Sequence, residues 1–98
     1  MIQIIKVTGE SLSPFFRDGD YALVAKFPFL LKRIRPGDIL VFRHPLFGTM
    51  IKRLERLSPD GEELFVVGED AFSNDSRRFG PIRRADLVGK VVWHSKRE

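Results

Sequence analysis

Residues 49–67 read TMIKRLERLSPDGEELFVV and carry a strong β-hairpin signal. Residues 49–57 and 63–67 are rich in β-branched and other apolar side chains, which is typical of strands. Between them lie residues 58–61 (SPDG), a run that favours a tight turn. The two flanking segments are therefore expected to pair as neighbouring antiparallel strands.

Other parts of the chain have the same short-period apolar character, and turn residues separate them. These segments are residues 2–7, 21–27, 38–43 and 88–93. Together with the hairpin they predict an all-β domain of about six mainly antiparallel strands, folded as a small curled sheet or partial barrel. Residues 68–86 show little periodicity, and a loop of that length in a compact domain is usually functional.

The chain has 98 residues, which predicts one domain over residues 1–98. It contains no Cys, so disulfides, thiolate catalysis and Cys-type zinc sites are excluded. Two His residues are too few for a metal site made from His alone, and we expect neither a metal nor a cofactor. The 17 Lys and Arg residues against 13 Asp and Glu residues give a mild net charge of +4.

The longest uninterrupted apolar run is residues 27–31 (FPFLL), whereas a membrane-spanning helix needs about 20 such residues. The first six residues are too short and too weakly flanked for a signal peptide. We therefore expect a protein without a transmembrane segment that resides in the cytoplasm. Four roles stay open for residues 27–31: peripheral contact with a membrane, a wall of a substrate site, a contact between subunits, or core filling.

Lys52 is the lysine whose surroundings best suit catalysis. A Ser and a Lys can cleave peptide bonds without His, provided that the Lys is uncharged and acts as general base. Apolar neighbours favour the uncharged form by desolvation. Strand alternation places Met50, Lys52 and Leu54 on one face, and Lys6 shows a weaker version of this pattern. The alternative is that Lys52 covers the core with its stem and keeps its ammonium in water.

Ser11 is a candidate nucleophile because it follows the first predicted strand, within residues 8–14 (TGESLSP). A nucleophile needs a tightly turned backbone with amides aimed at the developing oxyanion, and Gly9 permits such a turn. Ser11 could equally be an ordinary turn residue. A Ser-His-Asp arrangement is a weaker alternative, because His44 precedes a Pro at a strand end and His94 lies close to the end of the sequence.

Four segments in order resemble sequence boxes of the signal peptidase I family, serine proteases with a Ser/Lys dyad. Residues 9–14 (GESLSP) resemble its Gly-x-Ser-Met-x-Pro box, and residues 37–42 (GDILVF) its Gly-Asp-Ile-Val-Val-Phe box. Residues 51–54 (IKRL) resemble its Ile-Lys-Arg-Val box. Residues 68–70 (GED) and 73–80 (SNDSRRFG) resemble its Gly-Asp-Asn and Ser-x-Asp-Ser-Arg-x-aromatic-Gly segments. One box alone would be weak, but four in the right order cover most of the chain.

The resemblance implies that Ser11 is the nucleophile and that Lys52 is the general base, which later returns its proton to the leaving amine. It implies that the Ser11 backbone N–H forms part of the oxyanion hole and that Ser73 orients the Lys52 amine. Asp75 and Arg77 are implied to be an ion pair that holds the loop carrying Ser73. The substrate is a protein or peptide bound as an added strand, with small residues near the cut.

The sequence departs from the family in several places. Gly9 stands where some members have a Ser that helps to bind the oxyanion, and residues 68–70 differ from Gly-Asp-Asn. The family's membrane anchors and accessory β domain have no counterpart here. Residues 43–45 (RHP) and 75–81 (DSRRFGP) are more similar to the small nickel-type superoxide dismutase maturation proteases. Those enzymes trim a short N-terminal extension from a protein that then binds nickel, so the metal would belong to the substrate.

Two other classes of protein are considered. A basic β module that binds nucleic acid or an acidic protein partner is suggested by the isoelectric point of 9.9. It is also suggested by basic clusters at residues 32–35, 77–78 and 83–84. A relative of the self-cleaving repressors would share the Ser/Lys chemistry. Those repressors carry a separate DNA-binding domain, for which the sequence ahead of Gly9 leaves no room.

Overall fold

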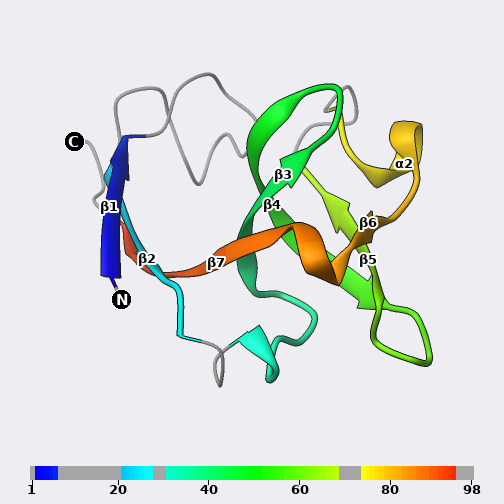
Figure 1. Ribbon diagram of the computed structural model, residues 1–98, viewed down its shortest axis with the longest axis horizontal. Coiled ribbons are helices and arrows are strands. Elements are labelled where there is room, and N and C mark those ends of the chain that lie inside the picture. Colours follow the sequence, from blue (N-terminus) through cyan, green and yellow to red (C-terminus); the bar gives the residue numbers. More distant parts are fainter. Residues whose placement is uncertain (1, 7–20, 28–30, 69–73, 95–98) are drawn as a thin grey trace.

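The computed structural model describes residues 2–6, 21–27, 31–68 and 74–94. They form a seven-stranded antiparallel sheet in the order β1-β2-β7-β3-β4-β5-β6 (Figure 1). The elements are β1 (Ile2–Lys6), β2 (Tyr21–Ala25), β3 (Ile39–His44), β4 (Gly48–Leu57), β5 (Glu63–Val67), helix α2 (Ser76–Phe79), β6 (Ile82–Arg83), the 3-10 helix η1 (Arg84–Asp86) and β7 (Leu87–His94).

The predicted all-β, mainly antiparallel fold class is confirmed. All of the predicted strands are present, and none of their ends differs from the prediction by more than two residues. The additional strand β6 and the helix α2 both lie within residues 68–86, where the sequence shows little periodicity. They contain two and four residues, and elements this short leave no periodic pattern in a sequence.

The hairpin between β4 and β5 has the predicted turn. The Ser58 N–H donates to the carbonyl of Glu63, and the Gly61 N–H donates to the carbonyl of Ser58, both at 2.9 Å. The Asp60 carboxylate accepts from the Ser58 hydroxyl at 2.6 Å and from the Glu62 N–H at 3.0 Å. Gly61 has a φ of 74°, which glycine adopts without steric cost. This turn aligns β5 with β4. It therefore also sets which residues of β4 lie beside the end of β5.

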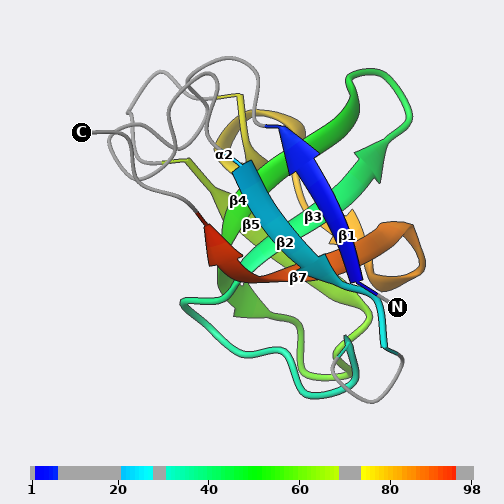
Figure 2. The same cartoon turned by 90° about the vertical axis from the view of Figure 1, so that its left-hand side faces the viewer.

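Successive side chains of each strand point to opposite faces of the sheet, and each face has an apolar cluster. The smaller cluster contains Val24, Val41 and Ile51. The larger cluster contains Ile34, Leu40, Phe42, Leu54, Leu64, Val66 and Ile82. Strands β3 and β4 therefore supply both clusters from the middle of the sheet. Figures 1 and 2 show that the strands twist strongly, with β1 and β2 toward one end and β5, β6 and α2 toward the other.

The apolar run at residues 27–31 is described only at its two ends, where Phe27 and Leu31 are both half-buried. The Leu31 N–H donates to the Phe27 carbonyl at 3.2 Å. The Leu31 carbonyl accepts a hydrogen bond from the Arg84 guanidinium, which ties this segment to η1. Among the described residues, no helix has both the length and the apolar character that crossing a bilayer requires.

Candidate active site

Lys52 lies in the middle of β4 with its side chain inside the protein. It pairs with Leu40 of β3, and its exposed fraction is 1%. The predicted alternation is present, because Leu54 belongs to the larger apolar cluster and Met50 packs against it. The alternative in which the ammonium of Lys52 extends into water is wrong. The backbone of β4 therefore holds a lysine in an apolar environment.

Burial lowers the pKa of Lys52, because desolvation penalises the charged ammonium and is the largest influence on this group. The Asp75 carboxylate acts in the opposite direction and raises the pKa, whereas the Arg77 guanidinium lowers it. The net pKa of Lys52 lies below its ordinary value of 10.5. More of this lysine is neutral at a given pH than of a lysine in water, as a general base requires.

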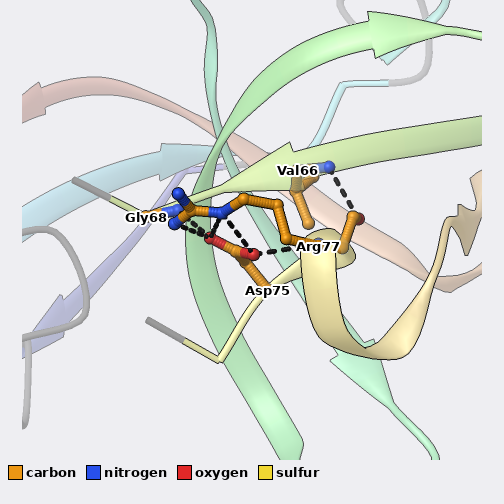
Figure 3. A network of polar contacts seen from close by, with 5 residues as sticks. Val66, Gly68, Asp75 and Arg77 are labelled. Carbon is orange, nitrogen blue, oxygen red and sulfur yellow. Dashed lines mark hydrogen bonds and ion pairs between the residues drawn. The ribbon is translucent and has the colours of Figure 1, made fainter. Parts of the chain in front are cut away.

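Asp75 is the second charged residue that is buried in the described part of the chain, with an exposed fraction of 0%. It caps the start of α2, where its carboxylate accepts from the Arg77 N–H at 3.0 Å. The Arg77 guanidinium contacts both carboxylate oxygens, with Nε at 3.0 and 3.1 Å and Nη2 at 2.7 Å (Figure 3). The Gly68 N–H donates to Oδ2 at 2.8 Å. Both oxygens of this buried carboxylate are thus satisfied.

The pKa of Asp75 is set by two opposing effects. Burial is the largest single influence and raises the pKa of this carboxyl. Hydrogen bonds from the Arg77 side chain and from the Gly68 and Arg77 amides lower it, as does the charge of Arg77. Together these contacts outweigh burial, so the net pKa lies below the ordinary value of 3.8. Asp75 is therefore an ionised carboxylate at neutral pH.

Strand β5 brings Asp75 into the neighbourhood of Lys52. In the β4–β5 register Arg53 lies opposite Val67, so the next residue, Gly68, falls beside Lys52. Because the Gly68 N–H binds the Asp75 carboxylate, that carboxylate is held within electrostatic range of the lysine. The lysine on β4 and the acid ahead of α2 thus lie near each other at the end of β5.

Helix α2 is fixed from two sides, and this fixes Asp75 in turn. The Ser76 hydroxyl accepts from the Val66 N–H at 2.8 Å, which joins α2 to β5. The Phe79 ring packs against the His44 ring with centroids 4.5 Å apart, which joins α2 to the β3–β4 hairpin. Sequence analysis did not single out Ser76. An Asp-Ser pair at the start of a helix is a capping signal that could have drawn attention to it.

His44, the weaker candidate for a Ser-His-Asp arrangement, has a structural environment. Its ring contacts those of Phe47 and Phe79, and its Nδ1 accepts a hydrogen bond from the Leu46 N–H at 3.1 Å. The imidazole therefore stabilises the tip of the β3–β4 hairpin. Within the described ranges, no three His, Asp or Glu side chains are close enough together to hold a metal ion.

The predicted nucleophile Ser11, together with Gly9 and Ser73, lies outside the described residues, so the roles of these three remain predictions. The Gly-Asp box is described. There the Asp38 carboxylate accepts from the Arg35 N–H at 3.0 Å and lies 3.3 Å from the Lys90 ammonium. The first two residues of this box, Gly37 and Asp38, form part of the turn that leads into β3. The described site therefore consists of Lys52 and the Asp75–Arg77 ion pair.

Residues 2–92 match the family described as Peptidase S24-like, so the chain belongs to this family of serine peptidases. Signal peptidase I V of Bacillus subtilis (strain 168) is 27% identical to the chain over an alignment of 136 positions. The alignment covers 88% of this chain and 81% of the relative. The predicted class, a serine protease related to signal peptidases, is supported at this coarser level. Neither finding concerns the nickel-type superoxide dismutase maturation proteases.

Proposed function

We propose that this chain is a serine endopeptidase that uses Ser11 as nucleophile and Lys52 as general base. The observation that carries the proposal is the lysine buried in the middle of β4, whose pKa is lowered by desolvation. An ordinary surface lysine is charged at neutral pH and cannot accept a proton. Membership of a serine peptidase family supports the same chemistry.

The proposed reaction follows from a neutral amine and a hydroxyl. Lys52 Nζ takes the proton of Ser11 while Ser11 Oγ bonds to the scissile carbonyl carbon. The backbone N–H of Ser11 binds the resulting oxyanion, and Ser73 orients the amine. Lys52 then gives its proton to the leaving amine as the C–N bond breaks. Water attacks the acyl-Ser11 ester with Lys52 again taking the proton, which returns to Ser11 Oγ as the acid product leaves.

The proposed substrate is a protein with an N-terminal extension or leader, bound in extended form as an added strand. The precursor of a nickel-type superoxide dismutase is the specific candidate, on the sequence similarity of residues 43–45 and 75–81. The reaction uses no cofactor, and any nickel belongs to the substrate after cleavage. The proposed location is the cytoplasm, where such a precursor would be trimmed.

The experiment is cleavage of two kinds of synthetic peptide by the full chain. One kind spans the leader junction of a nickel-type superoxide dismutase precursor, and the other is a library with small residues at varied positions. Ser11→Ala and Lys52→Met should each lower kcat/KM by at least about 10³-fold. Lys32→Met, which changes an exposed lysine, is the matched control and should retain full activity.

The pH dependence gives a second readout of the same proposal. For the wild-type chain, kcat/KM should rise with pH as Lys52 loses its proton, with a midpoint below the ordinary lysine pKa. Full turnover by the Ser11→Ala or the Lys52→Met variant would remove that residue from the mechanism. Cleavage of library peptides without cleavage of the dismutase leader would retain the chemistry and reject the specific substrate.

A further inference from the structure

Two charged side chains of opposite sign are buried in the described part of the chain, and they lie near each other. Lys52 is 1% exposed and Asp75 is 0% exposed. A buried ammonium and a buried carboxylate would ordinarily pair, because each lowers the cost of burying the other. No hydrogen bond or ion pair between Lys52 and Asp75 is present among the described residues. The carboxylate instead makes its ion pair with Arg77.

We propose that Arg77 is a positioning residue that keeps Lys52 uncharged, because it occupies the buried Asp75 carboxylate and prevents that carboxylate from pairing with the lysine. This inference rests on the proposed function, in which Lys52 must accept a proton. It gives Arg77 an electrostatic role beyond holding a loop in place. The guanidinium acts on Lys52 through Asp75.

The geometry of the Arg77 side chain suits this role. Its Nε lies 3.0 and 3.1 Å from the two carboxylate oxygens, and Nη2 adds a contact at 2.7 Å. This planar fork matches the geometry of a carboxylate and contacts both of its oxygens. Arg77 is also 48% exposed, so water stabilises its charge while it neutralises a carboxylate in the interior. A guanidinium in a protein keeps its charge at neutral and moderately alkaline pH.

Electrostatics explain why the partner matters for the lysine. An unpaired carboxylate in a low-dielectric interior would stabilise the ammonium form of a nearby lysine strongly. When the carboxylate is paired with Arg77, the guanidinium charge disfavours the ammonium and offsets part of the carboxylate's effect. Of the other described groups around Lys52, Leu40 on β3 is apolar, and Arg53 points to the opposite face of β4. Within the described part of the chain, Asp75 and Arg77 on the α2 side are thus the charged groups that act on it.

The arrangement also explains why a carboxylate is tolerated beside a base. Asp75 has structural duties, because it caps α2 and binds the Gly68 N–H at the end of β5. Without a partner, this structural carboxylate would favour the charged form of Lys52. Arg77 makes the two requirements compatible.

The test measures the titration of Lys52 in a set of charge variants of the full chain. NMR of ¹³C-labelled lysine follows the Lys52 Cε signal against pH, and the pH profile of kcat/KM is recorded in parallel. Arg77→Met should move both midpoints to higher pH and lower kcat/KM at pH 7 about tenfold or more, with recovery at high pH. Adding Asp75→Asn to this variant should move the midpoints back down and recover most of the loss.

The matched control is Arg78→Met, because Arg78 is the exposed neighbour of Arg77 on α2 and its side chain is not bound to Asp75. It should leave the Lys52 midpoint and the activity unchanged. A merely structural role for Arg77 predicts something different. In that case Arg77→Met would lose activity equally at every pH, and the double variant would be at least as impaired as the single one.

Each result bears on the inference separately from the proposed function. An unchanged Lys52 midpoint in a folded Arg77→Met variant would overturn the inference about Arg77. The proposed peptidase function would still be supported if the Lys52→Met variant loses cleavage. If circular dichroism shows that Arg77→Met does not fold, Asp75→Asn alone decides. Removing the carboxylate charge while Arg77 remains should shift the Lys52 midpoint to lower pH, and a midpoint that stays or rises would contradict the inference.

Discussion

The protonated form of Lys52 destabilises the fold in which it is buried. Its pKa in the folded chain is lower than its ordinary value of 10.5, which applies to the unfolded chain. Between the two values the unfolded chain binds more protons, so the free energy of unfolding rises with pH. The destabilisation by the buried lysine is complete below its pKa in the folded chain and absent above its pKa in the unfolded chain. A catalytic amine in this position therefore opposes stability at neutral pH.

The first prediction follows from the destabilising effect of the buried Lys52 at neutral pH. Lys52→Met should be more stable than the wild-type chain at pH 7 by about 1–3 kcal/mol, the usual cost of burying an imperfectly satisfied polar group. The difference should shrink as the pH approaches 10.5, where both states of the wild-type lysine become neutral. Urea unfolding at pH 7, 8.5 and 10 measures it. The account would be contradicted if the Lys52→Met variant were less stable than the wild type at pH 7, or if the difference in the free energy of unfolding did not change with pH.

The charged form of Asp75 stabilises the fold, whereas the charged form of Lys52 destabilises it. Asp75→Ala should destabilise the fold at neutral pH by about 3 kcal/mol, at the low end for a broken buried pair, because the half-exposed Arg77 can turn to water. The pKa of Asp75 is lowered in the folded chain, so its stabilisation is present above the ordinary value of 3.8. It disappears as the pH falls through the folded-state pKa. Urea unfolding should show the gap between wild type and variant closing in acid; an equal gap at pH 7 and pH 2.5 would speak against the ion pair.

Single residues differ in how well the sequence predicts them. The burial of Lys52 was predictable because β-strand alternation is a rule with a period of two, and both flanking positions on its face are apolar. The Asp75–Arg77 pair was implied only by resemblance to a family. Its geometry depends on an extended cap residue followed by a helix of four residues, and no periodic rule describes such a corner. The contact of Ser76 with Val66 joins residues that are distant in sequence and was missed for the same reason.

At the scale of elements, β7 depends on a close approach at Gly89. A Cβ atom built there would lie 2.4 Å from Val24 Cγ1 and 2.8 Å from the Ala25 carbonyl oxygen, both on β2. Because β7 joins β2 to β3 in the sheet, a side chain here would push the two halves apart. Gly89→Ala should therefore lower the free energy of unfolding by about 1–3 kcal/mol or more. Val92→Ala, at a half-exposed position of the same strand, is the control and should cost less than about 1 kcal/mol.

The six predicted strands were predictable as elements because each carries alternate or continuous apolar residues over at least five positions of the sequence. Their order in the sheet was not. Strand β7 comes last in the chain but lies between β2 and β3, and this placement arises from contacts between residues far apart in sequence. Local patterns carry no information about such pairing, so only the β4–β5 hairpin could be predicted as a neighbouring pair.

On the scale of the whole molecule, several of the described arginines are engaged by the fold. Arg77 binds Asp75, and Arg83 binds Asp86 at 3.1 Å. Arg84 donates to the carbonyls of Leu31 and Gly61. The Arg56 guanidinium lies over the Phe65 ring at 3.6 Å. Three of the four arginines at residues 77–78 and 83–84 thus have structural partners, which weakens that alternative.

The two functions differ in their dependence on salt. A module that neutralises Z phosphates loses affinity with a slope of about −0.9 Z in a plot of log K against log salt concentration. Because Arg77, Arg83 and Arg84 are engaged within the fold, titration of labelled single- and double-stranded DNA and RNA should give only weak binding, with a slope that corresponds to about one or two phosphates. A slope near −5 with submicromolar affinity at 150 mM salt would favour the binding module. The engaged arginines would then have to exchange their internal partners for phosphate, and hydrogen exchange at the Arg77 and Arg84 contacts would report that exchange.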